Sequence, residues 1–417
     1  MQVAVVGGGI VGVATAYFLG QAGHEVVVIE RHTNVAESAS FGSSGVLSAV
    51  DALPWATSGM SRRLLASLLQ EHAGVRFDIR ATWQFLRWTR RGRHHDEALR
   101  IMQNRSHSLR LGNYGQEVLQ ALAQELPIDF ERSRGYLQLF RTEREQSRSL
   151  ALQTFLAESE LPHEVLTAPQ ARLVEPALNP AAALTGALHL PQDGAGNCPL
   201  FCKHLRNAAQ ALGVTFHFGS VLDGIETLPG RAAGLMLRIG ANRFPVDAVV
   251  LAAGAGSAAL LRPLGIDLPL YPVRTYAATA AIRNFDDAPL GALADPLYQV
   301  AIARLGLRMR VAGIADFSQR PERMRNAAIG TLIKVASDWF PNAAHYNTAT
   351  FWSGIRPTLP DALPVIGPTP IPGLFLNLGQ AGTGWAMALG SARVVADQVS
   401  GRSADIDTEG FTMARYA

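Results

Sequence analysis

The stretch Gln2-Val-Ala-Val-Val-Gly-Gly-Gly-Ile-Val-Gly12 decides the fold of this chain. Its apolar start is typical of a buried strand, and the glycines that follow fit the pattern G-x-G-x-x-G. Residues 10–22 then have the pattern of a helix that ends at Gly23, and residues 25–30 form a second apolar run. The order strand, glycine turn, helix and strand predicts a dinucleotide-binding unit.

Each glycine of the turn has its own expected role. Gly7 permits the tight turn, Gly9 lets a pyrophosphate approach the backbone, and Gly12 lets the helix pack closely on the strand. Backbone N–H groups at the helix start, those of Ile10 and Val11 among them, should face the phosphates. The alternative is that the glycines serve tight packing alone.

An acidic residue stands at the end of the second strand. Glu30 lies 23 residues beyond Gly7, where a carboxylate accepts hydrogen bonds from an adenosine ribose. An acid at this position also disfavours the 2′-phosphate of NADP. We expect Glu30 and the adjacent Arg31 to contact the cofactor.

A second glycine-rich helix start follows near the C-terminus. The run Leu374-Phe-Leu-Asn-Leu-Gly-Gln-Ala-Gly-Thr-Gly-Trp385 leads into a helix that ends at about Ser400. Its return beside the first glycine turn leaves room for a long cofactor, so FAD is favoured over NAD. The helix start would stabilise negative charge on N1 and the C2 carbonyl of a reduced flavin, and a purely structural helix is the alternative. The expected contacts here are Gly382, Thr383, Gly384 and Trp385.

Two further segments complete the expected cofactor site. The loop Ser40-Phe-Gly-Ser-Ser-Gly45 offers N–H and hydroxyl groups to the pyrophosphate or the flavin edge, unless it is simply a polar loop. The apolar run from 246 to 253 ends at Gly254-Ala-Gly256, again a strand pattern that leads into a glycine turn. The expected contacts from these and neighbouring segments are Ser43, Ser44, Gly45, Val221, Ala253 and Gly254.

Composition places the chain among globular proteins of two or three domains. It has 417 residues, 48% of them apolar and 17% charged. No apolar run reaches the roughly 18 residues of a membrane span, and the N-terminus has a strand pattern instead of a signal peptide. We therefore expect a cytoplasmic protein. A formal charge of +3 is too small to indicate nucleic-acid binding.

The two cysteines, Cys198 and Cys202, are four residues apart and would share one helix face. Two buried thiols are a more common outcome than a redox pair. No second cluster of cysteines or histidines stands at metal-ligand spacing, so no metal site is predicted.

One segment departs from the even distribution of charge. Residues 55–95 carry eight arginines among Trp83, Phe85 and Trp88, with few acids. The segment either lies on an anionic membrane surface, which would make the protein peripheral to the inner face of the cytoplasmic membrane, or forms a solvated amphipathic helix pair packed on the domain.

The predicted fold class is α/β (α+β overall), with a Rossmann-like FAD-binding domain and an interleaved substrate domain built on an antiparallel sheet. A mostly helical region (about 55–165) and a region of short strands (about 270–315) would form the substrate domain. The predicted boundaries are 1–55, 190–268 and 350–417 for the discontinuous FAD-binding domain, and 56–189 and 269–349 for the substrate domain.

Several ordered blocks of this sequence resemble one family over nearly the whole chain. They are Val5–Ala14, Gln21–Val26, Gly135–Glu143, Val174–Leu178, Thr350–Pro357, Pro360-Asp361 and Gly382–Trp385. The chain resembles the D-amino-acid dehydrogenases within the glycine oxidase, sarcosine oxidase and D-amino-acid oxidase superfamily. The resemblance implies noncovalent FAD, a discontinuous flavin domain and a substrate domain that roofs the isoalloxazine ring.

Two segments depart from the pattern of that family. Gly379-Gln-Ala381 stands where the family usually has Gly-His-Gly, and Arg274-Thr-Tyr276 stands where it has Lys-Gly-Tyr. Both are expected near the flavin or its roof, so the side-chain preference for the substrate is left open.

By the same resemblance, Arg356 occupies the position of an arginine that binds an α-carboxylate. A guanidinium grips a carboxylate bidentately and so orients the α-carbon. The alternative for Arg356 is a structural ion pair with Asp361 or another acid. Tyrosine hydroxyls of the roof could complete the carboxylate site, and the candidates are Tyr271, Tyr276 and Tyr298, although core packing is the more common role of such residues.

The expected reaction is oxidative deamination of a small amino acid, in the D series, with D-proline and hydroxyproline included. Hydride transfer from the α-carbon to flavin N5 needs no strong protein base if the amine is neutral, and the imine then hydrolyses to a 2-oxo acid and ammonia. The only lysines, Lys203 and Lys334, do not look placed to activate oxygen, so a dehydrogenase that passes electrons to a quinone or another acceptor is favoured. The alternatives are an oxygen-using oxidase and a flavin subunit of a heteromeric dehydrogenase complex. The oligomeric state is left open.

Overall fold

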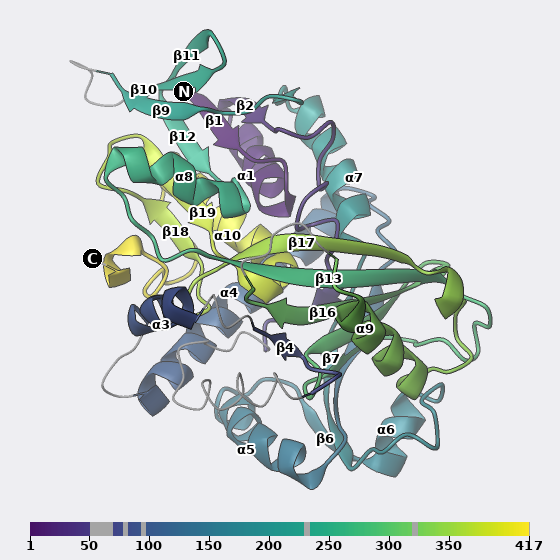
Figure 1. Cartoon of the computed structure of the whole chain (residues 1–417). Helices are drawn as coiled ribbons and strands as arrows, with labels where there is room; N and C mark the ends of the chain where they lie inside the picture. The colour runs from purple at the N-terminus through teal and green to yellow at the C-terminus, as the bar shows by residue number, and fades with distance from the viewer. Residues whose placement is uncertain (51–69, 78–81, 93–96, 229–233, 319–323, 417) are drawn as a thin grey trace.

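The strands of the N-terminal unit belong to a six-stranded, mostly parallel sheet (Figure 1). The computed structural model describes residues 1–50, 70–77, 82–92, 97–228, 234–318 and 324–416. The strand order is β18-β19-β12-β1-β2-β8, and only β18 runs antiparallel to its neighbour. The strands are β1 (Gln2–Val6), β2 (Glu25–Ile29), β8 (Thr215–His217), β12 (Ala248–Leu251), β18 (Val365–Pro368) and β19 (Leu374–Leu378).

The central strands are apolar on both faces because helices cover one face and a small three-stranded sheet, described below, packs on the other. Val3, Ala4 and Val5 of β1 are fully buried, as expected for a parallel strand between two layers. Helix α1 packs against α7 and α10, and α10 also packs against α4. These helices are α1 (Ile10–Gln21), α4 (Glu97–Glu125), α7 (Cys198–Ala211) and α10 (Gly384–Val399).

A second, ten-stranded sheet lies beside the first unit (Figure 1). Its main path runs β17-β13-β16-β15-β14-β5-β7-β3, and β4 and β6 pair off this path. The strands are β3 (Val46–Leu47), β4 (Val75–Arg76), β5 (Ser133–Phe140), β6 (Glu164–Thr167), β7 (Gly186–Ala195), β13 (Tyr271–Ala281), β14 (Ala292–Asp295), β15 (Val300–Leu305), β16 (Arg308–Asp316) and β17 (Thr350–Thr358). Helix α9 (Asn326–Trp339) packs on β13 and β16 and buries one face of this sheet.

The remaining elements are short or peripheral. A three-stranded antiparallel sheet has the order β11-β10-β9, with β9 (Gly224–Thr227), β10 (Leu235–Ile239) and β11 (Asn242–Val246). The helices are α3 (Thr82–Arg90), α5 (Glu143–Glu158), α6 (Ala168–Val174), α8 (Ser257–Leu261), η2 (Gly254–Gly256), η3 (Arg262–Leu264), η4 (Tyr346–Thr348), η5 (Ala381–Thr383) and η6 (Met413–Tyr416). Among the described residues, no helix is long and apolar enough to cross a membrane.

The predicted fold class is confirmed: a nucleotide-binding type of parallel sheet and a large, mainly antiparallel sheet occur in one chain. The domain boundaries stay a prediction. Strand β17, which the boundary at residue 350 assigns to the FAD-binding domain, pairs with β13 in the ten-stranded sheet. Strand β7 likewise spans the predicted boundary at residue 190.

Candidate active site

The glycine turn has the geometry that its sequence predicts. Gly7 adopts a φ of +112°, which side chains rarely allow, and a Cβ there would lie 2.5 Å from the carbonyl oxygen of Ala252 on the neighbouring strand. A Cβ on Gly12 would lie only 1.8 Å from the carbonyl oxygen of Gly7. Helix α1 can therefore approach the turn this closely only because residue 12 is glycine.

Glu30 supports the turn from the adjacent strand. Its buried carboxylate accepts a hydrogen bond from the N–H of Gly8 through one oxygen and from the N–H of His32 through the other, at 2.8 Å. It also lines the cavity described below. From the sequence, Glu30 is expected to bind a ribose; the two backbone contacts are a further role, since they connect the glycine turn to the loop after β2.

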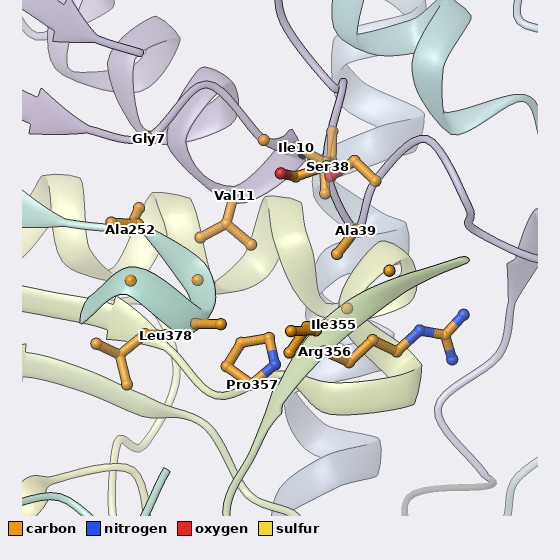
Figure 2. Close-up of a pocket in the computed structure, with 18 of the residues that line it drawn as sticks. Gly7, Ile10, Val11, Ser38, Ala39, Ala252, Ile355, Arg356, Pro357 and Leu378 are labelled. Atoms are coloured by element: carbon orange, nitrogen blue, oxygen red, sulfur yellow. Dashed lines mark hydrogen bonds between the residues drawn. The ribbon is translucent and has the colours of Figure 1, made fainter. Parts of the chain in front are cut away.

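A cavity of about 930 Å³ runs from the glycine turn to the end strand of the second sheet (Figure 2). Its wall includes η2 after β12, the start of α10 after β19, and strand β17. Its volume lies near the upper end of the range for small-molecule sites. The predicted site residues that line it are Gly7, Gly9, Ile10, Val11, Glu30, Arg31, Ser43, Val221, Ala253, Gly254, Arg356, Gly382, Gly384 and Trp385.

Four predicted cofactor residues do not line this cavity. Gly12 packs against the turn, and a Cβ on Gly45 would point toward Leu305. The Thr383 hydroxyl donates to the Gln380 carbonyl at 3.2 Å, and the Ser44 hydroxyl accepts from Val46 N–H at 3.4 Å. These residues shape the loops around the cavity.

Arg356 extends from β17 beside the start of α10 (Figure 2). Its side chain has no hydrogen bond or ion pair with any other residue in the part of the chain that the structure describes. Burial lowers the pKa of Arg356 to about 10, so the guanidinium stays a cation at neutral pH. Its Nη1 atom lies 3.7 Å from the position that a Cβ on Gly382 would take.

The structural ion pair considered for Arg356 is not formed, because Asp361 has other partners. The Asp361 carboxylate lies 2.7 Å from Nε of Arg415 and 3.7 Å from Nη2 of Arg100. Arg356 is thus left as a partly buried cation without a described counter-charge. Such a group carries a desolvation penalty that a bound anion would offset.

The three tyrosines lie outside the cavity lining. The Tyr271 hydroxyl donates to the Phe317 carbonyl at 3.1 Å, and the Tyr276 hydroxyl donates to Asp316 at 2.7 Å. The Tyr298 ring lies under Arg141, whose Cζ is 5.2 Å from the ring centroid. Tyr276 belongs to the apolar cluster beneath α9, on the sheet face that the helix covers. Strand alternation therefore directs this side chain away from a site on the opposite face.

Two further residues line the cavity: Arg274, whose segment was expected near the flavin without a role for Arg274 itself, and Trp352, for which no role was predicted. Arg274 is buried and donates to the Ser353 hydroxyl at 3.3 Å. Trp352 stands four residues before Arg356. Because side chains alternate along a strand, that even spacing was an available signal that both occupy one face.

Cys198 and Cys202 are both free and buried, as predicted. Burial, together with the adjacent Cys198 thiol, raises the pKa of Cys202 well above its ordinary value. Within the described ranges, no group of three or more potential ligands is arranged to hold a metal ion.

A family model described as FAD dependent oxidoreductase (DAO) matches residues 2–398. The chain belongs to the DAO family of FAD-dependent oxidoreductases. FAD is therefore the cofactor of this oxidoreductase. The glycine turn, in which a Cβ on Gly7 or Gly12 would clash with the backbone, and the long cavity both fit this cofactor.

Solved structures share the fold of this oxidoreductase over almost its full length. Glycine oxidase from Geobacillus kaustophilus is 23% identical, with a TM-score of 0.77 and coverage of 99% of this chain and 98% of that chain. Iminodiacetate oxidase from Chelativorans sp. BNC1 is 18% identical, with a TM-score of 0.73 and 98% coverage of both chains. L-Proline dehydrogenase from P. horikoshii is also 18% identical, with a TM-score of 0.73 and coverage of 100% and 96%.

Proposed function

We propose that this oxidoreductase oxidises a small amino acid of the D series at the bond between its α-carbon and its nitrogen. The observation that carries the proposal is Arg356, a partly buried cation in the cofactor cavity without a counter-charge among the described residues. An α-carboxylate is the anion that an amino-acid substrate offers to it. The resemblance to D-amino-acid dehydrogenases supports the stereochemistry.

The residues of the chain orient the substrate and exclude water. FAD, when bound, supplies the acceptor for the two electrons that leave the α-carbon. Arg356 holds the carboxylate on two N–H groups, which restricts the α-carbon to one position beneath β17. The lone pair of a neutral substrate amine stabilises the positive charge that develops, so a strong protein base is not required. The imine product hydrolyses in water to a 2-oxo acid and ammonia, whereas proline would yield a cyclic imine.

We propose a quinone or another electron carrier as the acceptor. Lys334 lies on α9 and pairs with Asp338 at 2.6 Å, and Lys203 is exposed on α7. Neither lysine lines the cavity, which disfavours a lysine-assisted reaction with oxygen. An oxygen-using oxidase and a flavin subunit of a heteromeric complex are the alternatives.

The substrate class is tested by anaerobic bleaching of the flavin with D- and L-amino acids, proline and hydroxyproline included. We expect bleaching by small D-amino acids. A single yellow chain that reduces a dye with such a substrate would exclude the subunit alternative. Bleaching by L-amino acids alone would contradict the proposed stereochemistry.

We expect the FAD to be noncovalent and to depend on Glu30. Acid precipitation should release all of the flavin into the supernatant. Glu30→Ala removes a carboxylate that accepts two backbone N–H groups, and hydrogen bonds to charged groups are worth about 1.5 to 3 kcal/mol. The dissociation constant for FAD, measured by fluorescence titration, should therefore rise roughly tenfold or more. Glu25→Ala, at the exposed start of the same strand, is the matched control. Unchanged affinity in Glu30→Ala would refute this assignment.

We also propose that the arginine-rich segment contacts an anionic membrane. Part of it, with Arg62, Arg63, Arg80 and Arg93, lies outside the described residues. In the described part, Phe85 and Trp88 of α3 are buried, whereas Trp83 is 80% exposed and Arg87 and Arg90 are exposed. Arginines near anionic lipid contribute about 1 kcal/mol each, and salt weakens them.

Flotation with anionic vesicles should therefore occur at low ionic strength and disappear at high ionic strength. Trp83→Ala combined with Arg87→Gln should reduce it, whereas neutral vesicles serve as the control. Absence of flotation at low salt removes the membrane proposal alone. Turnover with oxygen as fast as with a soluble quinone analogue would contradict the dehydrogenase assignment.

A further inference from the structure

Trp352 and Arg356 lie on the same face of β17. Alternate side chains of a strand share a face, so Trp352, Gly354 and Arg356 form one row. Opposite this row on β13 are Ala277, Thr275 and Val273. Trp352 also lines the cofactor cavity together with Arg356. The only side-chain position between the indole and the guanidinium on this face is therefore that of a glycine.

The indole of Trp352 occupies the space that this glycine leaves. A Cβ on Gly354 would lie 2.2 Å from both Cζ2 and Cη2 of Trp352, so the benzo ring covers residue 354. The ring thus extends along the strand toward Arg356 instead of away from it.

The loop that contains Phe41 and Gly42 also packs against the indole. A Cβ on Gly42 would lie within 1.9 Å of Cζ3 of Trp352, so only glycine allows the loop to approach. The Phe41 ring lies 6.5 Å from the indole, centroid to centroid. Nη1 of the buried Arg310, on β16, donates to the Phe41 carbonyl at 2.9 Å and so connects the loop to the ten-stranded sheet. These contacts therefore hold the Trp352 indole in place where it lines the cavity.

We infer that Trp352 limits the size of the substrate side chain. The inference rests on the proposed function, because it requires a carboxylate on Arg356. An amino acid held there places its α-carbon next to Gly354 along the strand, where the benzo ring of Trp352 closes the space. A hydrogen, a methyl group or a pyrrolidine ring fits beside the ring, whereas a branched or aromatic side chain meets it. Trp352 is thus the residue that makes this site one for small amino acids.

Trp352→Ala should enlarge the site without removing the carboxylate contact. The measurement is kcat/KM for D-alanine, D-leucine and D-phenylalanine at matched FAD loading. One extra or missing methylene in a pocket changes discrimination by about 10- to 200-fold, so the ratio of kcat/KM for D-phenylalanine to that for D-alanine should rise roughly tenfold or more. Trp352→Phe should give a smaller rise. Phe351→Ala, on the opposite face of the same strand and 38% exposed, should leave the ratio unchanged.

A binding measurement makes the test independent of turnover. Acetate and benzoate are carboxylates of different size, and the change in flavin absorbance on titration reports the dissociation constant of each. Benzoate should gain affinity relative to acetate in Trp352→Ala and, to a smaller degree, in Trp352→Phe. If Trp352→Ala does not fold or bind FAD, Trp352→Phe decides the question in both assays.

The two failures are distinguishable. If no amino acid reduces the flavin of the wild-type enzyme, the proposed function is wrong. Binding of acetate and benzoate would then still test whether Trp352 limits the size of the bound carboxylate. An unchanged preference for size in folded, FAD-loaded Trp352 variants overturns the inference while the proposed function stands.

Discussion

Arg356→Ala should lower kcat/KM for the amino-acid substrate by a factor that corresponds to about 2 to 5 kcal/mol of transition-state stabilisation. At 1.4 kcal/mol per tenfold, this is roughly 30-fold to several thousandfold. The reason is that Arg356 lines the cavity, is partly buried, carries a positive charge and has no other described partner. Its truncation removes orientation of the α-carbon as well as binding. The measurement is steady-state turnover with the flavin content matched to wild type.

Two further variants define what the loss means. Arg356→Lys keeps the charge but not the planar pair of donors, so it should recover only part of the activity. Arg308→Ala, on the exposed start of β16, should leave kcat/KM unchanged. Wild-type kcat/KM in Arg356→Ala would refute the carboxylate assignment. A loss of FAD instead of activity would place Arg356 in the cofactor site.

The second large effect is expected from Gly12→Ala, a change of one methyl group. That methyl would lie 1.8 Å from the Gly7 carbonyl oxygen, a backbone atom that can move only if the whole turn moves. Overpacking of this kind costs about 1 to 3 kcal/mol of folding free energy. The displaced turn should also lose its fit to the FAD pyrophosphate. We therefore expect a lower melting temperature and protein that purifies without the yellow colour.

Gly330→Ala is the matched control, because Gly330 is also a helical glycine but has open space around its Cβ position. Outside its chain neighbours and the backbone of its own helix, the nearest atom is Cε1 of His72, 4.0 Å away. Since alanine favours helices by about 1 kcal/mol over glycine, Gly330→Ala should preserve or raise the melting temperature and keep FAD bound. A Gly12→Ala protein with normal FAD content and stability would show that the helix can shift at little cost.

The glycine turn could be predicted from sequence because its constraints are local. A strand, three glycines and a helix start lie within a dozen residues, the steric exclusion at Gly12 involves the Gly7 carbonyl oxygen, and Gly7 itself needs a positive φ. The buried thiols followed from residue type and helical spacing in the same way. These features depend on short-range geometry that residue order specifies.

The roles of the tyrosines predicted for the substrate site depend on which face of the ten-stranded sheet each side chain occupies and on which element packs against that face. Tyr276 was a candidate for the carboxylate site, but it lies beneath α9 and bonds to Asp316. The parity of its position could be read from sequence, whereas the face that α9 would cover could not. Tyr271 lies in a different cluster, with Phe85 and Trp88 of α3, and its hydroxyl donates to Phe317, 46 positions away in the chain.

By itself, then, the sequence determined the nucleotide-binding unit, through glycines whose role is set by contacts with the neighbouring turn and strand. Through a resemblance to a known family, it also predicted that Arg356 stands at a carboxylate-binding position. Only the tertiary structure decided that Arg356 lacks a partner among the described residues while Asp361 pairs with Arg415, and that the loop at Gly42 packs on Trp352. The physical reason is that ion pairing and steric closure depend on distances between segments far apart in the chain, and packing of the two sheets sets those distances.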